Sequence, residues 1–191
     1  TVSSREPDRQ FSRDEIETVL LLAGYASVAL TDALTLDQRQ RALEAAEWQA
    51  THDPLTGLAN RRLVMETIND RLVSASGEMN VLYIDVDRFK SVNDRYGHHV
   101  GDLLIREVAE RINASTRSDD LVGRLAGDEI AVFVESSADA QGRREQASVL
   151  ARLVLNEVSR PLHVGENEIE VTASVGIAVA PDDADNVIDL I

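Results

Sequence analysis

An apolar strand that runs into acidic residues is the feature that most constrains the fold of this chain. Residues 81–87 read Val-Leu-Tyr-Ile-Asp-Val-Asp, and Arg88-Phe89-Lys90 follows as a turn. Short runs rich in β-branched and aromatic residues predict a buried strand. A carboxylate at the end of such a strand is costly unless it is paired or bound to a cation. Asp85 therefore predicts a sheet edge that attracts a cation.

Two more acidic residues lie in a tight turn. Segments 121–125 and 130–134 are rich in strand-forming residues, and they flank Ala126-Gly127-Asp128-Glu129, which is a hairpin signal. Such a turn can bring Asp128 and Glu129 to the same sheet edge as Asp85. Three carboxylates without cysteine or a histidine cluster favour a hard ion, Mg²⁺ or Mn²⁺. Taken alone, each acidic cluster is equally explained as a strand end or a solvated turn.

The remaining segments predict an α+β fold. Amphipathic spacing predicts helices over 61–74, 101–114 and 141–159, and a closing hairpin joins 162–164 to 168–179 around Gly165-Glu166-Asn167. Asn60 is placed to cap the first of these helices. The order of helix, strand, helix, hairpin, helix, hairpin predicts helices packed on a mainly antiparallel sheet.

The N-terminal part predicts a helical linker. Ser12 is a candidate N-cap with Glu15 three residues later, and apolar residues then recur at helical spacing up to Leu34. Leu36, Leu43 and Ala50 recur every seven residues, which indicates a modest coiled-coil seam. A solvated helix between two domains explains this pattern as well. The apolar run 19–30 is about half as long as a membrane span, so we expect a buried helix and no membrane insertion.

Charge and composition limit the partners. The chain has 19 Lys and Arg against 34 Asp and Glu, a net charge of -15, which argues against nucleic-acid binding by bulk charge. A phosphate ligand must therefore be held locally. The absence of cysteine agrees with a cytoplasmic protein.

Four motifs in order carry a resemblance to a known family. They are DPLTGLANRR at 53–62, DVDRFKSVND at 85–94, the pairs Gly97-His98 and Gly101-Asp102, and AGDEI at 126–130. In order and spacing, residues 52–191 resemble a GGDEF-family diguanylate cyclase domain. The run 11–34 resembles the last helix of a GAF sensor domain. The resemblance thus divides the chain into the end of a sensor domain (1–34), a helical signalling linker (35–51) and a GGDEF domain that is truncated at its C-terminus (52–191).

The resemblance implies a fold and a reaction. The fold is the palm type of cyclases and polymerases, a ferredoxin-like sheet flanked by helices, and a homodimer condenses two GTP into cyclic di-GMP and pyrophosphate. Four positions would hold Mg²⁺: Asp85, the carbonyl of Val86, Asp128 and Glu129. Asp128 is also the candidate base, and Lys90 would stabilise phosphate charge. Asn93 and Asp102 would read guanine, although a loop turn and a helix N-cap are the simpler explanations of these two residues.

The resemblance also implies product regulation. Arg117-Ser118-Asp119-Asp120 precedes the acidic turn by five residues, as does the inhibitory RxxD site of the family, so Arg117 and Asp120 would bind cyclic di-GMP. Standing alone, the motif is equally an ordinary surface ion pair.

Three departures from the family pattern open an alternative. Ala126 replaces the first glycine of the signature, Ile130 replaces its phenylalanine, and the basic helix that follows in the family is not in the sequence. The first hypothesis is an active cyclase regulated by an upstream sensor. The alternative is a degenerate module that binds GTP or cyclic di-GMP and regulates a neighbouring EAL-type phosphodiesterase domain.

Overall fold

A computed structural model describes residues 11–74, 78–164 and 167–191. The chain divides into two compact units, Thr1–Trp48 and Gln49–Ile191. We call the second the sheet unit. The first ten residues of the expected sensor segment and the turn at Gly165 and Glu166 lie outside the described residues.

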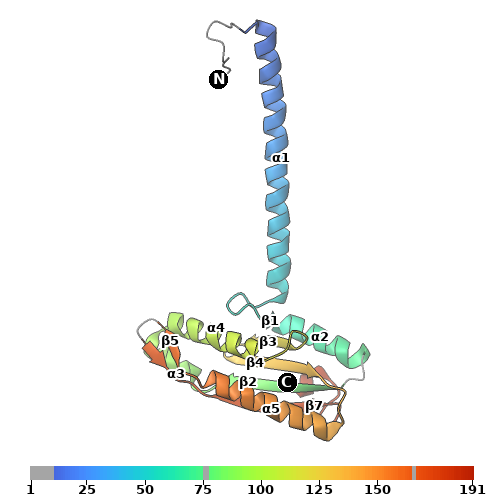
Figure 1. Ribbon diagram of the computed structural model, residues 1–191, viewed down its shortest axis with the longest axis vertical. Helices are drawn as coiled ribbons and strands as arrows, with labels where there is room; N and C mark the ends of the chain where they lie inside the picture. Colours follow the sequence, from blue (N-terminus) through green and yellow to red (C-terminus); the bar gives the residue numbers. More distant parts are fainter. Residues whose placement is uncertain (1–10, 75–77, 165–166) are drawn as a thin grey trace. The chain divides into compact units, whose positions relative to one another are not determined.

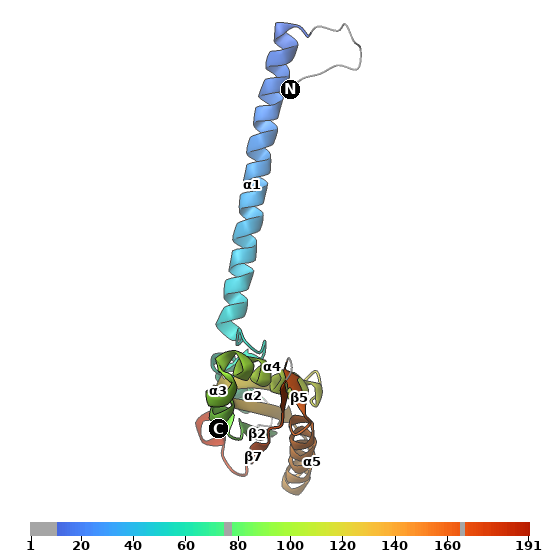
Figure 2. The same cartoon turned by 90° about the vertical axis from the view of Figure 1, so that its left-hand side faces the viewer.

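Helix α1 (Arg13–Thr51) is a single helix of 39 residues, seen from two directions in Figures 1 and 2. The predicted capping box opens it, because the Ser12 and Glu15 side chains each accept a hydrogen bond from the backbone N–H of the other residue, at 2.9 and 3.2 Å. No break separates the expected sensor helix from the expected linker at 34/35.

The expectation that residues 19–30 are buried is not met within this chain. No residue of α1 is buried, and Leu20, Leu30 and Leu36 are each more than 60% exposed. By length and composition, α1 is also able to cross a membrane, since an 18-residue window reaches a mean hydropathy of 1.7. Core helices of soluble proteins meet the same criterion, so the absence of membrane insertion remains a prediction.

The sheet unit is built on a mixed sheet of five strands flanked by helices. The strand order is β1-β3-β4-β2-β7, in which only the β1–β3 pair is parallel. The sheet is therefore mainly antiparallel, as the sequence predicts. The strands are β1 (Ala59–Asn60), β2 (Met79–Val86), β3 (Leu121–Ala126), β4 (Glu129–Glu135) and β7 (Ala173–Ala180).

Alternation along β2 separates two apolar cores. Leu82, Ile84 and Val86 pack with α4 (His98–Ala114) and α5 (Ala140–Val158) on one face of the sheet. Met79 and Val81 pack on the other face with α2 (Arg61–Ser74) and α6 (Val187–Leu190). A central strand that is buried on both faces has a continuous run of apolar residues. This run allowed β2 to be predicted from the sequence. Asn60 caps α2 as predicted, accepting from the backbone N–H of Leu63 at 2.9 Å.

The structure corrects three sequence-based boundaries. An additional helix, α3 (Phe89–Tyr96), follows β2 directly, and α4 begins at His98 rather than at residue 101. Gly97, at φ 85°, ends α3 and also precedes α4, and the two helices pack against each other. The expected closing hairpin is also divided. β5 (Leu162–Val164) pairs with β6 (Asn167–Ile169), whereas β7 pairs with β2 of the main sheet.

Candidate active site

Strand pairing brings the two predicted acidic clusters together. In the antiparallel β2–β4 pair, Asp85 lies directly opposite Glu129. Asp128 precedes Glu129 in the turn, and its carbonyl accepts a hydrogen bond from the backbone N–H of Val86 at 3.3 Å. Strands β2 and β4 thus place the Asp85 and Glu129 side chains at one end of the sheet, on the same face.

These carboxylates repel one another. Partial burial and the nearby charges of Asp128, Glu129 and Asp87 raise the pKa of Asp85 above its usual 3.8. Tyr83, two residues earlier on the same face, has a pKa raised to about 12 by burial and by a hydrogen bond to Glu129. Burial and neighbouring acids are the causes of the shift at Asp85, so the site is electronegative and favours a cation.

The three carboxylates alone do not form a complete metal-coordination site. Among the residues that the structure describes, no group of three His, Cys, Asp or Glu side chains is arranged to hold a metal ion. The donor set is all oxygen, which suits Mg²⁺ or Mn²⁺, and both ions commonly complete their coordination with water and substrate phosphates.

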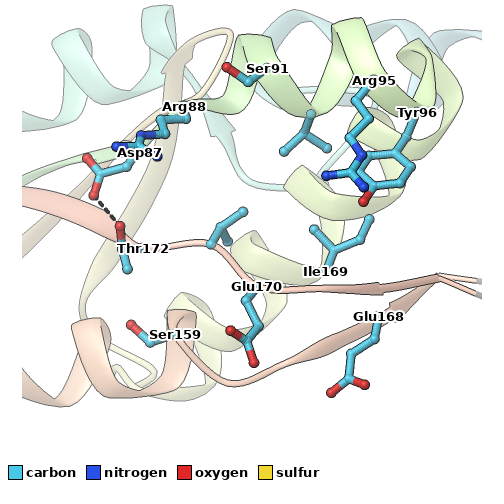
Figure 3. A pocket seen from close by; sticks show the side chains of 12 residues that line it. Asp87, Arg88, Ser91, Arg95, Tyr96, Ser159, Glu168, Ile169, Glu170 and Thr172 are labelled. Atoms are coloured by element: carbon cyan, nitrogen blue, oxygen red, sulfur yellow. Dashed lines mark hydrogen bonds between the residues drawn. The ribbon is translucent and has the colours of Figure 1, made fainter.

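Asp87, the second acid of the strand, has a structural role. Its two carboxylate oxygens accept hydrogen bonds from the hydroxyls of Thr172 and Ser174, which lower its pKa below 3.8. Figure 3 shows the Asp87 side chain directed at Thr172, at the edge of a cavity of about 760 Å³ next to Arg88. Asp87 thus joins the end of β2 to the segment that leads into β7, and this supports Asp85 as the free acid.

A strained turn carries the chain from β2 into α3. Arg88 has φ 58°, the only non-glycine residue with positive φ in the described chain. This left-handed conformation costs about 1–2 kcal/mol in a residue with a side chain. It directs the chain into α3, whose first turn presents Lys90 as an exposed cation. Backbone strain of this kind is concentrated at functional sites.

The two expected guanine-reading residues lie on adjacent helices. Asn93 is half-buried on α3, and Asp102 is exposed on α4. A Cβ on Gly101 would stand 1.9 Å from Asn93 Oδ1, so only glycine at 101 permits this position of the Asn93 side chain. Asp102 is not the N-cap of α4, because the helix begins at His98 after Gly97. The simpler explanation of Asp102 as a cap is therefore wrong.

A buried arginine supports the acidic turn, and sequence reasoning missed it. Arg124 on β3 donates through Nε and Nη2 to the carbonyl of Gly127, at 2.9 and 2.7 Å. Its Nη1 donates to Asp53 Oδ1 at 2.9 Å, and the two side chains are only 14% and 20% exposed. Asp53 also accepts from the N–H and hydroxyl of Thr56. Gly127, at φ 38°, makes the turn that exposes Asp128.

Comparison with known families assigns the sheet unit to a family. Residues 50–191 match the family described as diguanylate cyclase, GGDEF domain. The chain belongs to the GGDEF family. Relatives named as diguanylate cyclases are nucleotidyltransferases.

Individual relatives agree with this family. The chain is 41% identical over 137 residues to the bifunctional diguanylate cyclase/cyclic di-GMP phosphodiesterase MucR of Pseudomonas aeruginosa, which covers 70% of this chain and 19% of MucR. It is similar to a solved sensory box/GGDEF family protein of Caulobacter crescentus, with 33% identity and a TM-score of 0.68, covering 73% of this chain and 90% of that one.

A second solved structure extends into the N-terminal helix. The coiled coil and GGDEF domain of DgcB from Caulobacter crescentus, in complex with c-di-GMP, is 28% identical with a TM-score of 0.67. The match covers 84% of this chain and 86% of that one. The five-stranded sheet with flanking helices is thus the GGDEF fold.

The RxxD motif of this GGDEF domain borders a cavity. Asp120 accepts a hydrogen bond from the backbone N–H of Arg117 at 2.8 Å. The Arg117 side chain is exposed. A cavity of about 570 Å³ lies between this loop, the sheet and α5, and both Arg117 and Asp120 line it.

Proposed function

We propose that the sheet unit is a diguanylate cyclase domain that condenses two GTP into cyclic di-GMP and pyrophosphate. The observation that carries the proposal is the pairing of Asp85 with Glu129 beside Asp128, in a turn of the family signature and with the pKa of Asp85 raised. In the proposed reaction, the 3′-oxygen of each GTP attacks the α-phosphorus of the other. At each α-phosphorus the bond to the β-phosphate oxygen breaks, so two pyrophosphates leave for each cyclic di-GMP.

The donor set fits Mg²⁺ or Mn²⁺. Asp85, the carbonyl of Val86, Asp128 and Glu129 would hold it, because the uncompensated charge of these acids attracts a divalent cation. When bound, such an ion neutralises the triphosphate and lowers the pKa of the attacking hydroxyl. Asp128 accepts the proton of the 3′-hydroxyl, and Arg124 keeps its turn in position.

The helices after β2 supply the remaining contacts to GTP. Lys90, exposed at the start of α3, stabilises negative charge on the phosphates. Asn93 and Asp102 read guanine, because an amide beside a carboxylate offers both a donor and acceptors to the base edge. The fit of Gly101 against the Asn93 side chain supports this role.

Product binding at Arg117 and Asp120 is the proposed feedback control. The exposed Arg117 guanidinium binds phosphate and Asp120 binds guanine, next to a cavity of suitable size. That DgcB of similar fold was solved with c-di-GMP supports binding of this ligand.

Catalysis needs two domains, one for each GTP, so we propose a homodimer in which α1 pairs with α1 of a second copy. The exposed apolar residues of α1 and the seven-residue repeat of Leu36, Leu43 and Ala50 support this pairing. The helix would carry a signal from a GAF-like sensor at 1–34 through the linker at 35–51, in a cytoplasmic protein without membrane insertion or nucleic-acid binding.

One observation favours a second function. Ala126, in place of the first signature glycine, is exposed at the end of β3 and paired with Glu129 at a register shift. A methyl group there narrows the approach of a nucleotide, as in a degenerate module that binds ligand and regulates a neighbouring phosphodiesterase domain. The relative MucR is named as bifunctional.

Incubation of the full-length protein with GTP and Mg²⁺ separates the two functions. An active domain forms cyclic di-GMP and pyrophosphate in a 1:2 ratio, whereas a degenerate module binds GTP and releases neither.

A further inference from the structure

Asn80 occupies a position in β2 where the sheet pattern calls for an apolar residue. It shares its face with Leu82 and Ile84, both fully buried against α4 and α5. Asn80 itself is only 1% exposed, and its cross-strand neighbours are Val134 on β4 and Val179 on β7. An amide therefore lies within the apolar layer between the sheet and α5.

The side-chain oxygen of Asn80 has no protein donor. Asn80 Oδ1 is buried and has no hydrogen-bond partner among the described residues. An unsatisfied buried acceptor lowers stability, and an apolar residue of similar size would remove the penalty. The fold therefore does not need this amide, whereas a ligand with an N–H group would satisfy it.

The same residue lines the cavity that the RxxD motif borders. Asn80 comes from the sheet, Arg117 and Asp120 from the loop before β3, and Gln146 from α5. At about 570 Å³, this cavity falls within the roughly 300–1,000 Å³ of typical small-molecule sites. Asp120 and Gln146 already accept hydrogen bonds, from the Arg117 N–H and the Ser136 hydroxyl. Among the described residues, Asn80 Oδ1 is a fully buried acceptor without a donor, and Asn80 lines this cavity.

We infer that Asn80 is a specificity-determining residue that accepts a hydrogen bond from the guanine base of cyclic di-GMP; the inference rests on the proposed product binding at Arg117. Guanine presents two adjacent donors, N1–H and the exocyclic amine. Adenine presents a bare ring nitrogen at N1, which would oppose the Asn80 lone pairs. The Asn80 oxygen can accept from either donor of guanine, whereas N1 of adenine offers it none. Arg117 holds the phosphate, and Asn80 acts beside Asp120, which the proposed product site also assigns to guanine.

Calorimetry of cyclic di-GMP binding to the full-length protein tests this role, with Asn80→Val and Asn80→Ala beside the wild type. Loss of one hydrogen bond should weaken binding by about 3- to 10-fold. Without ligand, Asn80→Val should melt at a higher temperature than the wild type, because the orphaned amide is removed. The initial rate of GTP turnover at low product should not change, since Asn80 is outside the active site. If valine at position 80 prevents folding, the smaller side chain of Asn80→Ala still allows the binding measurement.

Two controls separate the inference from the function on which it rests. Gln146→Ala removes another amide from the same cavity, but one whose oxygen is already satisfied by Ser136, so binding should stay at the wild-type level. Wild-type affinity in both Asn80 variants, with weakened binding in Arg117→Ala, overturns the role of Asn80 and leaves the product site standing. Wild-type affinity in Arg117→Ala as well overturns the product site itself.

Discussion

Asp85 and Asp87 are two residues apart on β2 and have opposite electrostatic environments. Burial and three neighbouring acids raise the pKa of Asp85, and two hydroxyl donors lower that of Asp87. A raised carboxyl pKa gives stability that is complete below the unfolded value of 3.8 and is lost as pH rises through the folded value. Asp85 therefore weakens the metal-free fold at neutral pH, as expected of a residue kept for catalysis.

Replacing Asp85 should separate activity from stability. Asp85→Asn is expected to lower GTP turnover by at least about 100-fold, on the order of the loss of one strong transition-state contact. Without metal at pH 7, it should raise the melting temperature, and the gain should disappear below pH 3.8. Asp87→Asn is the matched control, and it should lower the melting temperature at pH 7, because Thr172 and Ser174 lose a charged acceptor. Turnover of Asp85→Asn at the wild-type rate would remove Asp85 from the metal site.

Arg124 makes a different prediction, because it links the turn to Asp53. Arg124→Ala should reduce the free energy of unfolding by about 1–3 kcal/mol, since the half-buried Asp53 carboxylate loses its charged partner and the Gly127 carbonyl loses the donors that Arg124 supplies. It should also lower turnover by misplacing Asp128. Arg62→Ala removes an exposed pair with Glu66 and should leave the free energy of unfolding nearly unchanged, because solvent screens this pair. Denaturant unfolding measures both variants, and equal losses would show that Arg124 is an ordinary surface residue.

Low pH should weaken the ion pair between Arg124 and Asp53. Burial by itself would raise the pKa of Asp53, but hydrogen bonds from Thr56 and Arg124 hold it below 3.8. A lowered pKa gives stability that is present above the unfolded value of 3.8 and is lost as pH falls through the folded value. The melting-temperature deficit of Asp53→Asn should thus be constant from neutral pH to about pH 4 and should shrink below it. A deficit that instead shrinks near neutral pH would point to another group.

Removing the Ala126 methyl group tests whether the domain is a degenerate module. Ala126→Gly is expected to tighten GTP binding or raise turnover, while added backbone freedom costs up to about 1 kcal/mol of stability. GTP titration and thermal melting of both forms give the two quantities. If affinity and turnover stay the same, the alanine is a tolerated variant and lends no support to a degenerate module.

Hydrophobic periodicity in the sequence predicted the helices and strands that have one clear local pattern. It did not predict features that depend on residues far apart in the sequence. Strand β2, the β3–β4 hairpin and helix α2 follow from local residues. The division of the last hairpin between two sheets depends on pairing with β2, about ninety positions earlier, which a local pattern does not contain. The Arg124–Asp53 link spans 71 positions for the same reason. Asn80 precedes the strand predicted over 81–87, and only the observed register places it in the layer between the sheet and α5.

The exposed apolar residues of helix α1 predict that the protein dimerises through this helix. Its apolar residues are exposed in a single chain, so a second copy should cover the seam of Leu36 and Leu43. Leu43→Lys places like charges opposite each other in a parallel pair and should shift the full-length protein toward monomer by at least about 10-fold in dissociation constant. Gln38→Lys is the control, because Gln38 lies on the opposite face of the helix from Leu36 and Leu43. Analytical ultracentrifugation measures the change, and an unchanged dimer in Leu43→Lys would place the interface elsewhere.

At the scale of the whole molecule, the sheet unit holds two sites that the proposed function connects. The acidic turn and the RxxD loop lie at opposite ends of β3, whose bounds are Leu121–Ala126. Binding of product at Arg117 can therefore influence β3 and the turn that Arg124 supports. With a net charge of -15, the molecule attracts no polyanion in general, so each phosphate group depends on a local cation: Lys90 at one site and Arg117 at the other.

We propose that this GGDEF domain is catalytically competent. Measuring the cyclic di-GMP that it forms from GTP tests this proposal. Full-length protein with GTP and Mg²⁺ should form cyclic di-GMP, with one pyrophosphate released for each GTP consumed. Asp128→Asn, at the same concentration and equally folded by circular dichroism, should form none. Detection of bound GTP without cyclic di-GMP in the wild type, or an equal yield from Asp128→Asn, would contradict the account.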